Sequence, residues 1–332
     1  MRKHIAEYVD GRVRFAAFTG KAAKVLRSKG CTDASTIHRL IYDVETNPET
    51  GVVTKTLTDA RVRKLKLIIV DECSMVDEEI GNDLLSFGIP VLVLGDPGQL
   101  PPVRGQGYFT SGRPNYMLRD IHRQAAESPI IDIATRIREG DFRGEEMVTE
   151  GLTICRRENL DPSVVPAAGA VIVGRNATRD RFNQRMREIR GYTDDTPQPG
   201  EPVICLRNDR ELQIFNGEVF EVDKRRRSRR TAYGRVLNYV LSDPEDAGRD
   251  PFKVSVYEHC FQGVGRLEQV PFKARAGTHQ FDYGYTITCH KAQGSQWDDV
   301  VVFDESRAFR DDASKWLYTA VTRAANNLTL VV

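Results

Sequence analysis

The sequence lacks the features that mark several protein classes. Its six cysteines are scattered and contain no CxxC pair, so neither a zinc knuckle nor a disulfide framework is indicated, and a reducing, cytosolic setting is expected. No apolar run approaches the ~18 residues of a membrane span. The first residues, MRKHIAEYVDG, contain no apolar signal-peptide core. Secretion and membrane insertion are therefore poor interpretations.

An excess of charge of one sign is also missing. Lys+Arg number 48 and Asp+Glu 47, which gives a net charge of +1. Any polyanionic partner must therefore be bound by local basic surfaces, not by the field of the whole molecule. The 332 residues, 40% of them hydrophobic, are enough for two domains and an insertion.

The first part of the chain alternates apolar runs with helical patterns. The runs at 13–19, 65–71 and 90–96 are short, continuous and separated by amphipathic stretches, which predicts a parallel sheet covered on both faces. The polar segment 44–59, rich in turn residues, predicts a protruding hairpin within this first α/β domain, which we expect over 1–115.

A second α/β domain is expected over 116–206 and 283–332. Its apolar strands include the run at 168–174 and the run at 298–304. The intervening segment 207–282 holds short β-prone stretches at the spacing of a small antiparallel barrel. We interpret this segment as a β insertion in the second domain.

Two strand ends carry groups suited to phosphoryl transfer. IIVDECSM (68–75) places Asp71 and Glu72 at the end of an apolar strand, where one carboxylate can hold Mg²⁺ and the other can orient a water molecule. VLVLGDPGQLPPV (91–103) ends a second strand in a proline-stiffened loop that presents Gln99, an amide able to sense a γ-phosphate. Taken alone, the first segment could be a capped helix start and the second a surface turn.

Together and in this order, DECSM and GDPGQLPPV resemble motifs II and III of superfamily-1 helicases of the RecD/Dda-like group. FTGKAAKVL (18–26), LRDIHRQ (118–124) and YTAVTRA (318–324) are similar to further motifs of that family. The resemblance implies two RecA-like parallel-sheet domains, a pin formed by the hairpin at 44–59, and an SH3-like insertion. It also implies ATP-dependent, 5′→3′ translocation and unwinding, with ATP and Mg²⁺ as cofactors and single-stranded DNA and a duplex fork as partners.

The resemblance also assigns roles to particular residues. The implied catalytic residues are Asp71, Glu72, Gln99, Arg123 and Arg323, which together with Gly294 would bind the nucleotide, Asp71 being the metal ligand. The implied nucleic-acid contacts are Thr19, Gly20, Lys21, His38, Asn176, Thr288, His290 and Lys291, and Asn183 also stands at a family position.

One element of a triphosphatase is missing from the sequence. No GxxxxGK[ST] segment is present, and FTGKAA (18–23) is no substitute because Ala22 stands where a magnesium-binding Ser/Thr would be. We therefore expect a truncated or split product, incomplete at the N-terminus of its first domain, that hydrolyses ATP poorly unless an upstream-encoded segment or partner supplies the loop. The alternatives are a non-catalytic single-strand-binding protein or a subunit of a larger RecD-like or relaxase-helicase assembly. RNA also remains open as the substrate.

The insertion contains a basic run, KRRRSRR (224–230). Such a run can bind phosphates by counterion release, but it can equally be a solvated charged face.

Overall fold

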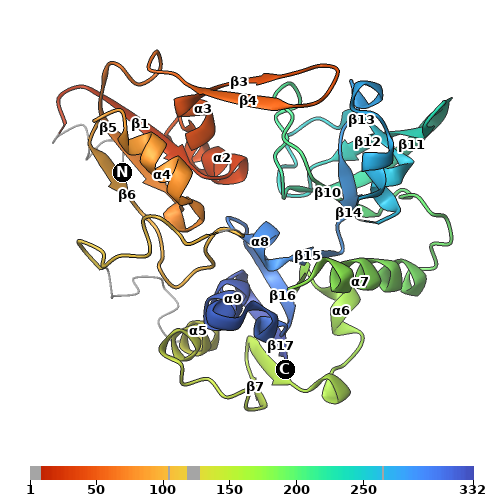
Figure 1. The fold of residues 1–332 in the computed structure, drawn as a ribbon. Coiled ribbons are helices and arrows are strands. Elements are labelled where there is room, and N and C mark those ends of the chain that lie inside the picture. The colour runs from red at the N-terminus through yellow and green to blue at the C-terminus, as the bar shows by residue number, and fades with distance from the viewer. Residues whose placement is uncertain (1–8, 104, 118–127, 264) are drawn as a thin grey trace. The chain divides into compact units, whose positions relative to one another are not determined.

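The computed structural model describes residues 9–103, 105–117, 128–263 and 265–332 (Figure 1). The chain divides into two compact units. The first comprises Met1–Asn47 and Val52–Ala126, and the second comprises Pro48–Gly51 and Glu127–Val332. Each unit is described by itself.

The first unit is built on a four-stranded parallel sheet. The strand order is β2-β1-β5-β6, with β2 at Ser35–Thr36, β1 at Arg12–Ala17, β5 at Leu65–Asp71 and β6 at Val91–Val93. The helices are α2 (Gly20–Ser28), α3 (Ile37–Ile41) and α4 (Glu78–Leu85). On β5, Ile68 and Ile69 belong to two separate hydrophobic clusters and are both buried, so the sheet is covered on both faces, as the continuous apolar run predicts.

The segment expected to be a hairpin is an antiparallel pair of strands. β3 (Tyr42–Thr46) pairs with β4 (Val53–Leu57), with Tyr42 opposite Leu57. All of its strand residues except Tyr42 are exposed, so the hairpin contributes almost nothing to a core. Its role as a strand-separating pin stays a prediction.

The second unit contains a six-stranded sheet of order β15-β9-β16-β17-β8-β7. All neighbours are parallel except the pair β7–β8. The strands are β7 (Met147–Thr149), β8 (Leu152–Cys155), β9 (Ala170–Val173), β15 (Thr286–Thr288), β16 (Trp297–Phe303) and β17 (Ala324–Val331). The helices are α5 (Pro129–Glu139), α6 (Val164–Ala167), α7 (Asn176–Ile189), α8 (Cys289–Ala292) and α9 (Ala313–Val321). The two parallel sheets confirm the predicted α/β class.

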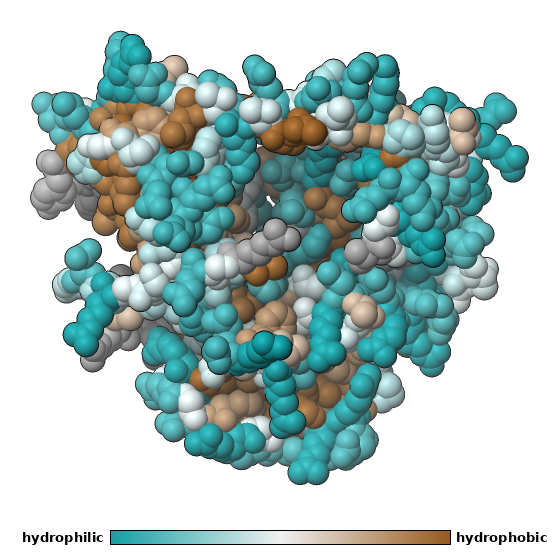
Figure 2. Space-filling model, viewed as in Figure 1, coloured by the Kyte–Doolittle hydropathy of each residue, from teal (hydrophilic) through white to brown (hydrophobic). Residues whose placement is uncertain are grey.

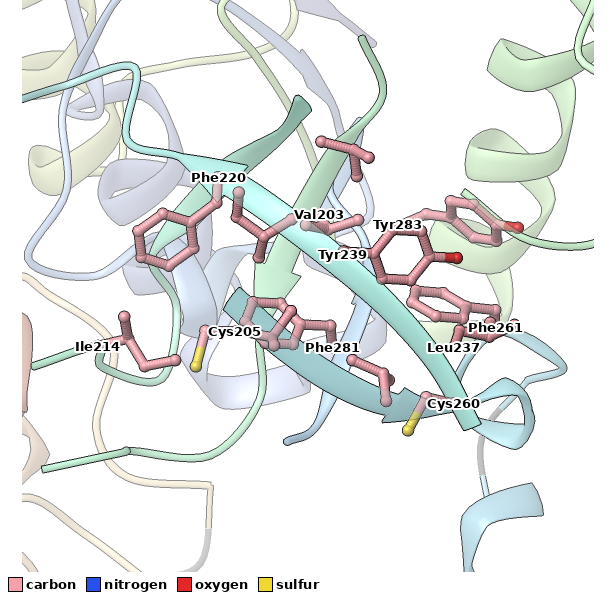
Figure 3. Packing of buried hydrophobic residues seen from close by; sticks show 14 of the residues in the cluster. Val203, Cys205, Ile214, Phe220, Leu237, Tyr239, Cys260, Phe261, Phe281 and Tyr283 are labelled. Carbon is pink, nitrogen blue, oxygen red and sulfur yellow. The ribbon is translucent and has the colours of Figure 1, made fainter. Parts of the chain in front are cut away.

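A five-stranded antiparallel sheet completes the second unit. Its order is β13-β12-β11-β10-β14, with β10 at Pro202–Cys205, β11 at Val219–Thr231, β12 at Gly234–Ser242, β13 at Phe252–Tyr257 and β14 at Phe281–Tyr283. Figure 3 shows its core, in which Phe220, Tyr239 and Phe281 pack together with little exposure. The sheet begins at Pro202 and not at residue 207, because β10 pairs with both β11 and β14. Its SH3-like character stays a prediction.

Helix α7 connects the two sheets of this unit. Arg187 donates from Nε to Oε1 of the fully buried Glu201 at 2.8 Å, and the hydroxyl of Tyr285 donates to the same oxygen at 3.0 Å. A buried charge that lost its partner would be costly, so this satisfied pair fixes α7 against the start of β10.

The remaining helices are short 3₁₀ turns at Cys73–Met75, Arg157–Asn159, Glu258–Phe261, Arg266–Gln269, Phe272–Arg275 and Ser306–Asp312. Among the described residues, no helix has both the length and the apolar character needed to cross a bilayer.

Candidate functional site

The two acidic residues lie where β5 ends at the carboxyl edge of the first sheet. Asp71 is the last residue of β5, and its Oδ1 accepts a hydrogen bond from the backbone N–H of Glu72 at 3.0 Å. Glu72 has a left-handed backbone (φ 53°), which costs a non-glycine residue about 1–2 kcal/mol. Such strain is typical of functional turns, and here it turns the chain sharply just after the sheet.

The loop that carries Gln99 lies beside this turn. The N–H of Cys73 donates to the carbonyl of Leu94 at 3.1 Å, and the N–H of Leu94 donates to the carbonyl of Val70 at 2.7 Å. The two backbones are so close that a Cβ on Gly95 would lie 2.6 Å from Sγ of Cys73. The structure therefore brings the Asp71–Glu72 turn and the Gln99 loop together at one edge.

Gln99 has an unused acceptor within this loop. Its backbone N–H donates to the carbonyl of Asp96 at 3.1 Å, and Oδ1 of Asp96 accepts from the N–H of Gly98 at 2.9 Å, so the loop is held by its own residues. Oε1 of Gln99 and Oγ of Ser74 are buried and have no hydrogen-bond partner in the described part of the chain. Buried polar atoms of this kind normally bind water or a ligand.

These groups fit magnesium bound together with a nucleotide. Carboxylate and amide oxygens are the hard donors that Mg²⁺ prefers, and Mg²⁺ usually takes one or two carboxylates and completes its shell with water and phosphate. Within the described residues there is no cluster of three or more His, Cys, Asp or Glu side chains that could hold a metal by themselves. The role of Asp71 as a metal ligand stays a prediction.

The predicted nucleic-acid residues of the first unit follow the next two strands of the same sheet. Thr19 caps helix α2, with its hydroxyl accepting from the N–H of Ala22 at 3.1 Å, so Gly20 and Lys21 form the first turn and are largely buried. His38 on α3 contacts the ring of Phe18, with centroids 5.9 Å apart. Burial lowers the pKa of His38, which favours a neutral ring at neutral pH.

In the second unit, Arg323 lies in the turn between α9 and β17 and is 8% exposed. Its guanidinium donates from Nε to the carbonyl of Thr319 at 2.9 Å and from Nη1 to the carbonyl of Ser295 at 3.2 Å. Nη2 donates to the hydroxyl of Thr322 at 3.0 Å. Gly294, which precedes Ser295, adopts φ 75°, a conformation that favours glycine. The structure thus places Gly294 directly before a residue that contacts Arg323, and their shared nucleotide-binding role stays a prediction.

Three positioning residues around Arg323 were not predicted from the sequence. They are Thr319, Thr322 and Ser295, and Oγ of Ser295 is itself buried without a partner in the described regions. Thr319 lies four residues before Arg323, so this spacing could have predicted their contact from the sequence. The contact with Ser295 joins segments 28 residues apart and leaves no local pattern.

The remaining predicted contacts of the second unit lie around β15 and α7. Thr288 ends β15 and is buried, and the ring of His290 on α8 lies 5.9 Å from that of Phe309. Burial lowers the pKa of His290. Asn176 begins α7 and is exposed, so it is available to a ligand.

The structure does not show two other residues at motif positions, Asn183 and Arg123, as possible ligand contacts. Asn183 is buried, and its side chain accepts from the N–H of Thr286 at 2.8 Å and donates to the carbonyl of Tyr283 at 3.2 Å, which makes it an anchor for β15. Arg123 lies outside the described residues, so its predicted role is unaffected.

Lys291 provides a pH-dependent prediction. Burial and the nearby Arg179 lower its pKa to about 8, against the opposing effect of Asp282. Lys291 is therefore charged below pH 8 and neutral above it. If Lys291 contacts a DNA phosphate, single-strand affinity should fall a few-fold between pH 7 and pH 9 as that contact is lost.

Fluorescence anisotropy with a labelled oligonucleotide at constant salt would measure this fall. Lys291→Arg is the matched control, since arginine stays charged over this range and should flatten the profile. A fall that is the same in Lys291→Arg would show that another group is responsible.

Comparison with known proteins finds similarity to helicases. Residues 1–155 match the model of an AAA domain, and residues 283–331 match that of a UvrD-like helicase C-terminal domain. The ATP-dependent RecD2 DNA helicase of Deinococcus radiodurans is 27% identical over 347 residues, covering 96% of this chain and 43% of the relative. The RecBCD enzyme subunit RecD of Mycolicibacterium smegmatis is 26% identical over 385 residues, covering 96% of this chain and 62% of the relative.

The chain thus spans between two fifths and two thirds of these relatives. A structure of Bacteroides Pif1 bound to single-stranded DNA shares the fold, with a TM-score of 0.56 and 16% identity over 100% of this chain and 91% of the other. These matches confirm the resemblance inferred from the motifs: the chain is similar to superfamily-1 helicases of the RecD type, and its fold is shared with Pif1.

Proposed function

We propose that these 332 residues form the motor core of an ATP-dependent DNA helicase that moves 5′→3′ along single-stranded DNA and separates the duplex at a fork. The observation that carries the proposal is the carboxyl edge of the first sheet, where Asp71, Glu72 and the unpartnered oxygen of Gln99 follow adjacent strands. The polarity rests on the family resemblance alone.

The proposed chemistry needs positioning more than covalent catalysis. ATP with Mg²⁺ supplies the phosphoryl group. Asp71 would hold the metal, Glu72 would orient the attacking water, and Gln99 would sense the γ-phosphate. Arg323, with Arg123, would neutralise the charge that develops on the transferred group. In this proposal Asp71, Glu72 and Gln99 act together with Arg323 and Arg123 on one nucleotide.

DNA contacts on both units would convert nucleotide turnover into movement. Thr19, Lys21 and His38 belong to the first unit, and His290 and Lys291 belong to the second. If the nucleotide state changes how tightly each of these two sets of residues holds the strand, alternating grips produce a step. The hairpin β3–β4 would act as the pin that divides the two strands.

We also propose that turnover requires a phosphate-binding loop that these residues do not contain. We call the 332 residues together with a GxxxxGK[ST] segment, in the same chain or in a partner, the loop-supplied form. Without that segment, the 332 residues contain no phosphate-loop lysine that could bind the β- and γ-phosphates.

Steady-state ATP turnover with and without single-stranded DNA tests both proposals. We expect slow turnover by the 332 residues alone and strong DNA-stimulated turnover by the loop-supplied form. Robust turnover by the 332 residues alone, abolished by Asp71→Ala, would contradict the need for a supplied loop. A loop-supplied form that neither turns over ATP nor binds single-stranded DNA would contradict the motor itself.

The second candidate, which these residues leave open because they contain no GxxxxGK[ST] segment, is a non-catalytic protein that binds single-stranded nucleic acid. It predicts salt-sensitive binding that ATP and Mg²⁺ do not change. Titration of a labelled oligonucleotide with and without both cofactors distinguishes the two candidates, since a motor should change its affinity with nucleotide state.

A further inference from the structure

The basic run lies on an exposed sheet edge. β10 pairs with β11 only over Val219–Glu221, whereas β12 accompanies β11 to Thr231. From Lys224 onward, β11 therefore has a described strand on one side only. Figure 1 shows this end of β11 projecting from the rest of its sheet, and large hydrophilic side chains extend from the same region in Figure 2. We call residues 224–230 the basic edge.

The charge of the basic edge is largely uncompensated. Among its cations, Arg225 pairs with Asp194 at 3.0 Å. Of the acidic groups nearby, Glu258 pairs with Arg235 at 2.6 Å, and Asp223 accepts from the hydroxyl of Ser242 at 2.6 Å. Five exposed side chains remain that form no ion pair within the described chain: Lys224, Arg226, Arg227, Arg229 and Arg230.

A purely protective role would not require this pattern. Charges on an edge strand prevent edge-to-edge aggregation, but charges of mixed sign serve that purpose equally well. Here every charged residue of the run has the same sign. A row of one sign is what a polyanion requires, because each neutralised phosphate releases counterions.

We propose that the basic edge binds the phosphate backbone of duplex DNA. This inference rests on the proposed function, in which duplex DNA is the substrate. A strand rises about 3.3 Å per residue, so the edge extends roughly 20 Å. One strand of a duplex rises 3.4 Å per nucleotide while it winds around the axis, so that length can reach several phosphates.

Two features favour a duplex over a single strand. The run contains no aromatic residue on which bases could stack, and stacking is a principal source of single-strand affinity. In addition, β11 pairs with β12 over 224–226 and again over 229–231, with an irregularity between Arg226 and Arg229, and this pairing fixes most of the row in an extended conformation. A row of cations that is already ordered loses little conformational entropy on binding, and the phosphates of a duplex are likewise already held in fixed positions.

The test compares two triple variants in binding to a blunt DNA duplex without nucleotide. Arg226→Gln/Arg229→Gln/Arg230→Gln removes three charges from the basic edge. Arg138→Gln/Lys253→Gln/Arg266→Gln removes three exposed charges dispersed over the same unit. For the first variant we expect Kd to rise about 10- to 100-fold near 0.1 M salt, and the slope of log Kd against log salt to fall by about 2–3. The dispersed control should change little.

Three outcomes would overturn the inference that the basic edge binds duplex DNA. An unchanged duplex Kd and slope in the edge variant, with an unchanged Tm, would show that the edge does not bind duplex. An equal loss in the dispersed control would show an effect of net charge only. A loss for a single-stranded oligonucleotide but not for the duplex would assign the edge to single strands.

Measurements on single-stranded DNA distinguish a failure of this inference from a failure of the proposed function. Single-strand binding and DNA-stimulated turnover of the loop-supplied form should be the same in the edge variant and the unsubstituted protein. If the unsubstituted protein binds duplex through the edge but never binds single strands, the motor proposal fails while the inference survives.

Discussion

Arg323→Gln is expected to lower DNA-stimulated ATP turnover by the loop-supplied form at least about 10³-fold, the low end of the effect of an arginine that stabilises a phosphoryl-transfer transition state. The structure explains why this guanidinium is suited to the role. Three of its donors are fixed by Thr319, Ser295 and Thr322, so it is preorganised and needs no rearrangement as charge develops.

Two controls separate this role from structural damage. Arg323→Lys keeps the charge but loses the planar fork, so we expect nucleotide affinity to survive while kcat remains low. Arg307→Gln removes an exposed arginine from the same unit and should leave kcat unchanged. Retention of kcat by Arg323→Gln, or a loss of kcat only in proportion to a fall in Tm, would contradict a direct role of Arg323 in phosphoryl transfer.

Asp71→Asn is expected to lower kcat of the loop-supplied form about 10²- to 10³-fold and to raise the Mg²⁺ concentration needed for half-maximal turnover. A metal contributes several kcal/mol to transition-state stabilisation, and each 1.36 kcal/mol corresponds to about a tenfold change in rate. Asparagine keeps the shape of the side chain and an acceptor for the N–H of Glu72, but it removes the charge that holds the metal.

Asp77→Asn is the matched control. Asp77 caps α4 in the same unit, with Oδ1 accepting from the N–H of Ile80 at 2.9 Å, and asparagine caps equally well. Turnover and its Mg²⁺ dependence should therefore be unchanged. If Asp71→Asn behaved like Asp77→Asn in a magnesium titration, Asp71 would not be the metal ligand.

The first sheet and the polar residues at its carboxyl edge could be predicted from the sequence because the signals are local. A continuous apolar run followed at once by Asp71 and Glu72 specifies a buried parallel strand with polar groups at its end. Thr19 lies directly before a helical pattern, and its cap on Ala22 follows from that position. Each of these features depends on residues only a few positions apart.

The environment of several site residues was not readable, because it depends on distant partners. Asn183 anchors Thr286, 103 residues away, and no local pattern distinguishes an anchoring asparagine from one that contacts a ligand. The lowered pKa of Lys291 follows from burial beside Arg179, which is itself bound to Asp282 at 2.8 Å. The start of the antiparallel sheet at Pro202 likewise depends on pairing with β14.

In the proposed function, Asp71 and Arg323 act on the same nucleotide. A double-mutant cycle in kcat/KM for ATP, with Asp71→Asn, Arg323→Gln and both together in the loop-supplied form, tests it most directly. Groups that share a substrate couple, whereas distant sites without a shared partner add within about 0.5 kcal/mol. We expect the double variant to be little worse than the worse single variant, and a fully additive loss would contradict the claim.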